Sequence, residues 1–134
     1  AAGEVVMTHA WHGRIVDANV KEKKDFAVMW DGQVQIPDLY AIIKGTKNLE
    51  AAQDFIRFAS SSQPLADQAK YISYGPARKS SAPLVGLYQD GKTEMAPHMP
   101  TSPEALKNAL TNDFEFWADR DVELSEKFNA WLLK

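Results

Sequence analysis

Short strand-like apolar segments alternate along this chain with segments whose apolar residues recur at helical spacing. We expect strands over residues 4–11, 25–30 and 34–44. We expect helices behind Gly13, from Asn48, over 60–72, from Ser102 and over 111–134. Segment 4–11 is apolar on both faces, which suits a sheet that is covered by helices. The alternation therefore predicts an α/β fold.

Three positions limit the expected elements. Pro37 lacks a backbone N–H, so the third strand lies at a sheet edge or is interrupted there. Asn48 is a suitable N-cap for a helix with apolar residues at 49, 52, 55, 56 and 59. Asn112 or Asp113 can cap the last helix in the same way. We expect its inner face to consist of Phe114, Trp117, Val122, Leu124, Phe128, Trp131 and Leu132.

Length and composition exclude several classes of protein. The 134 residues predict one compact domain, and 45% apolar residues are enough for a core. A net charge of −3 argues against a nucleic-acid partner. The absence of cysteine excludes a disulfide scaffold and a cysteine nucleophile. No apolar run approaches the ~18 residues of a membrane span. We expect no signal peptide in the given sequence, which begins with AAGE rather than Met.

The residues that carry chemistry give no support to catalysis. His9 and His12 are three residues apart, where a strand leads into a helix, and no carboxylate stands nearby at metal-ligand spacing. The chain contains no G-x-S-x-G nucleophile elbow, P-loop or G-x-G-x-x-G motif. We therefore expect no enzyme, metal site or cofactor.

Some residues at the expected strand ends are candidates for a binding site. Trp11 and Arg14 follow the first strand, and Asp38 stands in an apolar run. An unpaired buried carboxylate is costly, so Asp38 has three readings: a ligand partner, a salt bridge with Arg14 or a lysine, or an exposed bend beside Pro37. Trp11 is either a ligand platform or a core residue. The residues alone leave these alternatives open.

Four longer motifs carry a family resemblance from end to end. They are MTHAWHGRIVDA (7–18), the block from residue 26 to residue 61 that contains IPDLYAIIKGTKNLEAAQDFIRF, YISYGPAR (71–78), and NDFEFWADRDVELSEKFNAWL (112–132). Together they resemble the C-terminal portion of bacterial ABC-transporter solute-binding proteins of the spermidine/putrescine type. The first resembles that family's strand ending in W-N-G, and the second its D-x-x-A-I-P-K-G-T-K-N-x-E-A-A block.

The resemblance implies a fold that this chain contains only in part. Family members have the two-lobed, type II periplasmic-binding-protein fold, in which the ligand is trapped between two α/β lobes. By this analogy residues 1–38 belong to lobe 2 and residues 39–78 supply a strand and helices to lobe 1. Residues 79–134 return to lobe 2 with the long C-terminal helix. The first lobe is then incomplete, so we expect apolar surface to be exposed unless the missing N-terminal portion or a second copy of the chain covers it.

The resemblance also assigns roles to candidate residues. It places Trp11 in the cleft wall, where an indole attracts an alkylammonium, and gives Asp38 the ligand's ammonium group. Tyr40 and Tyr74 are further cleft candidates. The sequence departs from the family pattern at His12, which replaces an asparagine, and at Ile36, which replaces an aromatic residue. Arg14 would repel a polyamine and bind a carboxylate, so with Asp38 it favours a zwitterionic ω-amino acid of the γ-aminobutyrate kind.

The resulting hypothesis is a fragment of the solute-binding component of an ABC importer. Its partners would be a small amine or amino-acid ligand and a membrane permease, and its location the periplasm or the extracellular face of the membrane. Two alternatives remain: binding of putrescine or spermidine, and a non-binding assembly module that uses the apolar face of residues 49–59. A missing lobe would weaken ligand binding, because half of the burying surface is absent.

Overall fold

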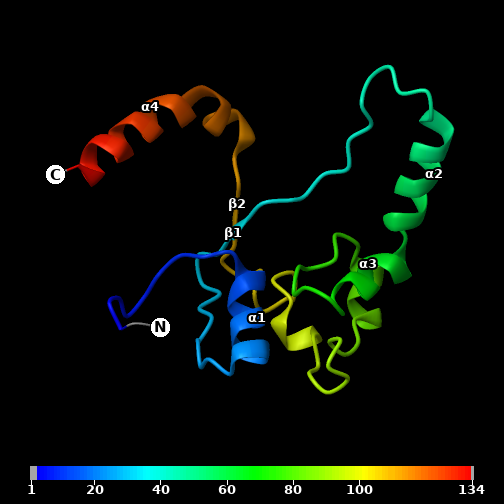
Figure 1. Cartoon of the computed structure of the whole chain (residues 1–134), viewed down its shortest axis with the longest axis horizontal. Helices are drawn as coiled ribbons and strands as arrows, with labels where there is room; N and C mark the ends of the chain where they lie inside the picture. Colours follow the sequence, from blue (N-terminus) through cyan, green and yellow to red (C-terminus); the bar gives the residue numbers. More distant parts are fainter. Residues whose placement is uncertain (1–2, 134) are drawn as a thin grey trace.

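The computed structural model describes residues 3–133, which form a small mixed α/β structure with few strands (Figure 1). Its regular elements are the helices α1 (His12–Glu22), α2 (Leu49–Ala59), α3 (Ser62–Gln68) and α4 (Phe114–Leu132), the 3-10 helices η1 (Lys79–Leu84) and η2 (Ala96–His98), and the strands β1 (Val34–Gln35) and β2 (Leu110–Thr111). Mixed helix and strand content agrees with the predicted α/β class. Within residues 3–133, no helix is long and apolar enough to cross a membrane.

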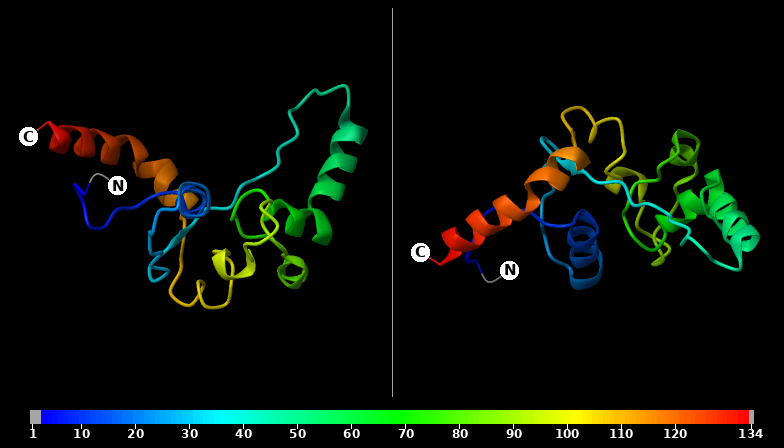
Figure 2. Two further views of the ribbon diagram at one scale, coloured as in Figure 1. Left: turned by 60° about the horizontal axis from the view of Figure 1, so that its bottom comes forward. Right: turned by 90° about the horizontal axis from the view of Figure 1, so that it is seen from above.

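The chain forms a central body from which two helical arms project. The body contains α1, α3 and the loops that follow α3, whereas α2 and α4 extend away from it on opposite sides (Figures 1 and 2). The short parallel ladder of β1 and β2 lies where both arms leave the body (Figure 1). Its register pairs Val34 with Leu110 and Gln35 with Thr111. This ladder therefore fixes the origins of the two arms relative to each other.

A small core joins α1 to the loops of the body. It consists of Val16, Ala69, Tyr88, Met95 and Met99, with Val20 and Val85 packed against it. Val16 and Val20 are four residues apart, so they lie on the same face of α1 and bury it together. This pattern explains why the helix predicted behind Gly13 forms. It begins at His12, before Gly13, and ends at Glu22; the left-handed backbone of the C-cap Lys23 (φ 56°) closes its C-terminus.

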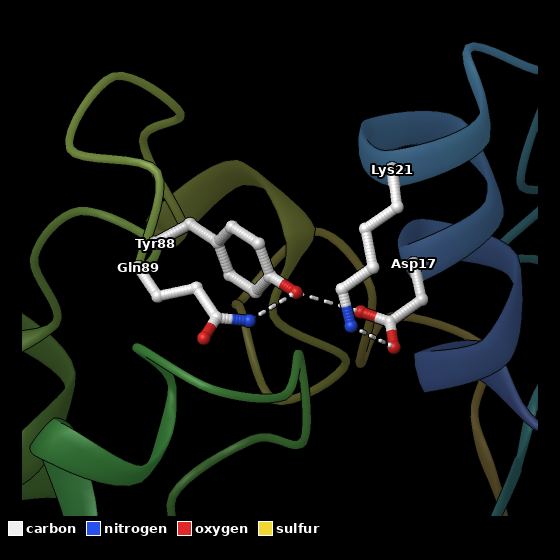
Figure 3. Close-up of polar contacts among 4 residues, drawn as sticks. All are labelled: Asp17, Lys21, Tyr88 and Gln89. Carbon is white, nitrogen blue, oxygen red and sulfur yellow. Dashed lines mark hydrogen bonds and ion pairs between the residues drawn. The ribbon is translucent and has the colours of Figure 1, made fainter.

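A polar cluster completes the contact between α1 and the body (Figure 3). The buried Tyr88 hydroxyl donates to Asp17 Oδ1 at 3.0 Å and accepts a hydrogen bond from Gln89 Nε2 at 2.9 Å. Lys21 Nζ donates to the other oxygen of Asp17 at 2.9 Å, and this bond raises the pKa of Lys21. The hydroxyl of the buried tyrosine is thus satisfied by its sequence neighbour Gln89 and by Asp17 of α1, which lies 71 residues away.

The helices expected from Asn48 and Asp113 are confirmed, whereas the helix over 60–72 is shorter than predicted. Asp113 caps α4 as expected, because its side chain accepts from the N–H of Phe116 at 2.9 Å. Asn48 precedes α2 but makes no side-chain capping bond. The expected inner face of α4 is wrong for this structure: Leu124 is partly buried, and the other six residues are exposed.

Three strand predictions fail wholly or in part. Residues 4–11 and 25–30 form no strand, and only Val34 and Gln35 of the third segment are paired. Within residues 3–133, pairing is confined to β1 with β2 and to a single bridge between Leu87 and Glu94. A strand needs backbone partners from another segment. The first two segments have suitable side chains, but within residues 3–133 no other segment pairs its backbone with them; the N–H and carbonyl of Phe26 bond to the side chain of Asn19 instead.

The helix expected from Ser102 is also wrong, because residues 101–108 form a series of turns. The Ser102 hydroxyl does accept from the N–H of Ala105 at 3.2 Å, as a cap would. However, the carbonyl of Ala105 accepts a hydrogen bond from Gln33 Nε2 at 2.6 Å, and the N–H of Ala109 bonds to Leu106 instead. A contact across 72 residues therefore competes with the local helix and directs the chain into β2.

Candidate ligand-binding site

The first turn of α1 presents two of the five predicted binding residues to solvent. Trp11 is the N-cap of α1, has an extended backbone and is 64% exposed. Arg14 is also exposed, and its N–H donates to the Trp11 carbonyl at 3.0 Å. The indole and the guanidinium therefore stand on one helical turn. Trp11 is not a core residue, so that alternative is wrong.

Tyr74 lies against the same turn through Gly13. A Cβ atom at position 13 would lie 2.7 Å from Cε1 of the Tyr74 ring and 3.0 Å from Cγ1 of Ile72. Only a glycine permits this close approach of α1 to residues 72–74. Tyr74 is half-buried, in contrast to Trp11. The structure thus brings the segments that carry Trp11, Arg14 and Tyr74 together.

Asp38 and Tyr40 are both exposed on the connection that leads from β1 to α2. Asp38 is exposed and forms no ion pair within residues 3–133, which excludes the salt bridge with Arg14, and residues 36–43 contain neither a bend nor a turn. The Tyr40 ring contacts Phe55 of α2 edge to face, with 6.0 Å between the ring centroids. None of the five predicted residues lines either of the two hollows described next.

The two hollows described in this structure are lined by other residues. One, of about 290 Å³, lies between Trp30–Asp31 and the turns that carry Glu104, Lys107 and Asn108. The other, of about 460 Å³, lies beside Tyr88 and is lined by Lys70, Leu87 and their neighbours. Within residues 3–133, no group of three or more His, Asp or Glu side chains is arranged to hold a metal ion.

Sequence reasoning missed the contacts that hold the first turn of α1 in place. His12 Nδ1 lies 3.1 Å from the Ser73 carbonyl, and the imidazole packs against the indole of Trp30 with 4.7 Å between centroids. Burial lowers the pKa of His12, and the bond to Ser73 opposes this effect. No local pattern marks Ser73 as a partner, because it lies 61 residues away.

Comparison with known proteins identifies the family. Residues 1–101 match the family described as bacterial extracellular solute-binding protein, and the chain belongs to this family. It is also 40% identical over 131 residues to a protein of Pseudomonas aeruginosa named gamma-aminobutyric acid-binding protein. The alignment covers 98% of this chain and 35% of that relative, so the chain spans about a third of the relative's length.

The comparison confirms the predicted family of solute-binding proteins. The family description and the relative's name both refer to binding, and neither names a catalytic activity. The family description also indicates function outside the cytoplasm. The two-lobed fold, the residue ranges of the lobes and the five binding residues remain predictions.

Proposed function

We propose that this chain is part of the solute-binding component of an ABC importer and contributes to the capture of a small ligand that carries an amine. The first candidate is a zwitterionic ω-amino acid such as γ-aminobutyrate. The observation that carries the proposal is the 40% identity, over nearly the whole chain, to a protein named for binding this compound. The proposed location is the periplasm or the extracellular face of the membrane, and the proposed partner is a membrane permease.

The first turn of α1 offers suitable chemistry for such a ligand. The exposed Trp11 indole provides a face for an ammonium group, and the Arg14 guanidinium can bind a carboxylate with two parallel hydrogen bonds. Tyr74 lies next to this turn through its contact with Gly13. A diamine has no carboxylate and would be repelled by Arg14. This charge favours an amino acid over putrescine or spermidine.

Asp38 is proposed as the ammonium-binding residue at a crossing between two lobes of a type II periplasmic-binding-protein fold. Residues 1–38 and 79–134 are assigned to lobe 2, and residues 39–78 to lobe 1. The projection of α2 away from the body supports a separate environment for the segment after Asp38 (Figure 1). Ala69, by contrast, belongs to the range assigned to lobe 1 but packs with Val16 in the core of the body, so this contact does not support a return as late as residue 79. Closure of the lobes would bring Asp38 towards Trp11 and Arg14.

A thermal-shift titration of the 134-residue chain tests this proposal, because a ligand that binds the folded state raises its unfolding midpoint. The ligands are γ-aminobutyrate, putrescine and a neutral α-amino acid at millimolar concentrations. We expect a midpoint increase with γ-aminobutyrate that is lost in Asp38→Asn. Arg14→Gln is expected to abolish the response to γ-aminobutyrate and to leave or improve a response to putrescine.

Asp25→Asn is the matched control, since Asp25 is exposed and lies outside the proposed site. It is expected to respond like the unmodified chain. A response to putrescine alone, unchanged in Arg14→Gln, would replace the amino-acid proposal with the polyamine alternative. Equal responses in Asp38→Asn and Asp25→Asn would remove Asp38 from the site.

A further inference from the structure

His12 connects the first turn of α1 to two remote segments of the body. Its Nδ1 atom is 3.1 Å from the Ser73 carbonyl and 3.4 Å from the Ser73 hydroxyl. Its ring packs against Trp30 at an interplanar angle of 49°. Its Nε2 atom is enclosed, and no group within residues 3–133 forms a hydrogen bond with it. We call this arrangement of His12, Trp30 and Ser73 the His12 joint.

The geometry determines where the imidazole carries its proton. A carbonyl oxygen only accepts hydrogen bonds, so Nδ1 of His12 is protonated and donates to Ser73. The enclosed Nε2 is then the bare nitrogen. A second proton would bind there, where the N–H would be buried without an acceptor. Burying an unpaired polar group is costly, and for a charged group the cost is larger.

The charges around the joint do not offset this cost. The titratable groups on the adjoining segments are Tyr74 beside Ser73, Asp31 beside Trp30, and His98, whose positive charge also lowers the pKa of His12. The carboxylate of Asp31 accepts from Asn108 Nδ2 at 2.7 Å. No carboxylate within residues 3–133 forms a hydrogen bond or ion pair with His12. The neutral imidazole is therefore the form that fits the joint.

The joint lies inside the group of residues proposed to bind ligand. His12 stands between Trp11 and the Gly13–Arg14 pair, and its partner Ser73 precedes Tyr74. One hydrogen bond thus sets the position of Trp11 and Arg14 relative to Tyr74. We propose that His12 is a positioning residue whose neutral form fixes the first turn of α1 against residues 73–74, and whose protonation releases it. The consequence for ligand affinity rests on the proposed function.

The direction of the pH effect follows from the fit of the neutral form. Because the folded joint binds a proton less readily than free histidine, whose pKa is 6.5, stability is full above that value. Stability decreases as the pH falls below 6.5 and levels off below the lower pKa that His12 has in the folded state. Each unit by which the His12 pKa differs between the unfolded and folded states corresponds to about a tenfold change in the folding equilibrium constant. Ligand affinity is expected to decline in the same window.

Nuclear magnetic resonance of the 134-residue chain tests the joint without any ligand. We expect the nitrogen shifts of His12 to show a protonated Nδ1 and a bare Nε2, with a titration midpoint below 6.5. The signals of the Trp30 indole and the Tyr74 ring are expected to change at that same midpoint. His12→Asn keeps a donor for Ser73 but does not titrate. In this variant the Trp30 and Tyr74 signals are expected to lose that pH-dependent change.

Titration with γ-aminobutyrate from about pH 7 to about pH 5 provides the second readout. Affinity is expected to fall with pH in the unmodified chain, by up to about tenfold per unit of pKa separation, and to stay level in His12→Asn. A proton on Nε2 of neutral His12, or a midpoint at or above 6.5, would overturn the proposal, as would equal pH profiles in both proteins. If the resonance results are as expected and no ligand binds at any pH, the proposed function fails and the positioning role stands.

Discussion

Gly13 is the residue at which a single methyl group is expected to disturb the proposed site. In Gly13→Ala the new Cβ would meet Tyr74 at 2.7 Å and Ile72 at 3.0 Å, so α1 or residues 72–74 must move. Overpacking of this kind costs about 1–3 kcal/mol. We expect a lower urea midpoint and changed resonances for Tyr74.

Gly86→Ala is the matched control for this substitution. A Cβ atom at Gly86 would have nothing within 4 Å, and no left-handed backbone is needed there. The same chemical change is therefore expected to leave the midpoint unchanged or slightly raised, because alanine reduces the freedom of the unfolded chain. Equal effects at both positions would contradict the role assigned to the contact between Gly13 and Tyr74.

Asp90 is expected to make one turn of the body sensitive to acid. Its carboxylate accepts from the Thr93 hydroxyl at 2.6 Å and from the N–H groups of Thr93 and Lys92 at 2.9 Å. These bonds lower the pKa of Asp90 from 3.8 to about 2, and the bond from the Thr93 hydroxyl has the largest effect. The charged form of Asp90 is favoured in the folded state. Its contribution to folding stability is therefore complete above pH 3.8 and is lost as the pH falls towards 2.

Amide hydrogen exchange between about pH 5 and pH 2 measures this effect, after correction for the intrinsic pH dependence of exchange. Protection of Thr93 is expected to fall in the window of the Asp90 titration. In Asp90→Asn the Thr93 amide is expected to be less protected at every pH, and its protection is expected to show no change in the window where Asp90 titrates. Asp67, whose carboxylate accepts a hydrogen bond from the side chain of Gln63, provides the comparison. A step that persists in Asp90→Asn would assign the titration to another carboxylate.

At the scale of elements, α4 is a helix whose N-terminus depends on one side chain. Asp113 accepts from the N–H of Phe116, and the described helix has no packed face to compensate for its loss. Asp113→Ala is expected to destabilise the helix by about 1 kcal/mol and to fray its first turn. Circular dichroism and amide exchange at residues 114–117 measure this change. Asp119→Ala, in the exposed middle of α4, is expected to keep or increase the helicity.

The sequence predicted α1, α2 and α4 well, because a helix forms its backbone bonds locally. It failed for residues 4–11 and 25–30, because a strand depends on a partner that the segment itself does not specify. The turns at 101–108 depend on Gln33, whose amide occupies the Ala105 carbonyl. At the site, sequence reasoning selected Trp11 and Arg14 from their place after the first expected strand, and Tyr74 through the family resemblance. It could not find the bond between His12 and Ser73, which only the folded chain creates.

At the scale of the whole molecule, the chain exposes far more surface than a compact protein of its mass. Its accessible surface is 10872 Å², whereas a compact 15.0 kDa protein has about 7,000 Å². Much of the excess lies on the two arms, where α2 exposes Phe55 and Phe58 and α4 exposes Trp117 and Trp131. Faces of this kind favour contact with another apolar surface. The expected exposure of apolar surface is confirmed.

Self-association through α2 is the outcome that this surface predicts for the chain in solution. Phe55 and Phe58 are 59% and 67% exposed, and a stable interface needs only about 1,200–2,000 Å² of buried surface. Light scattering is expected to show a mass that rises with concentration, and Phe55→Asp to shift this rise to higher concentration, because association would bury a charge. Gln53→Asp adds the same charge to α2 at an exposed polar position and is expected to have little effect. A constant monomer mass in the unmodified chain, or equal behaviour of the two variants, would show that α2 is not the contact surface.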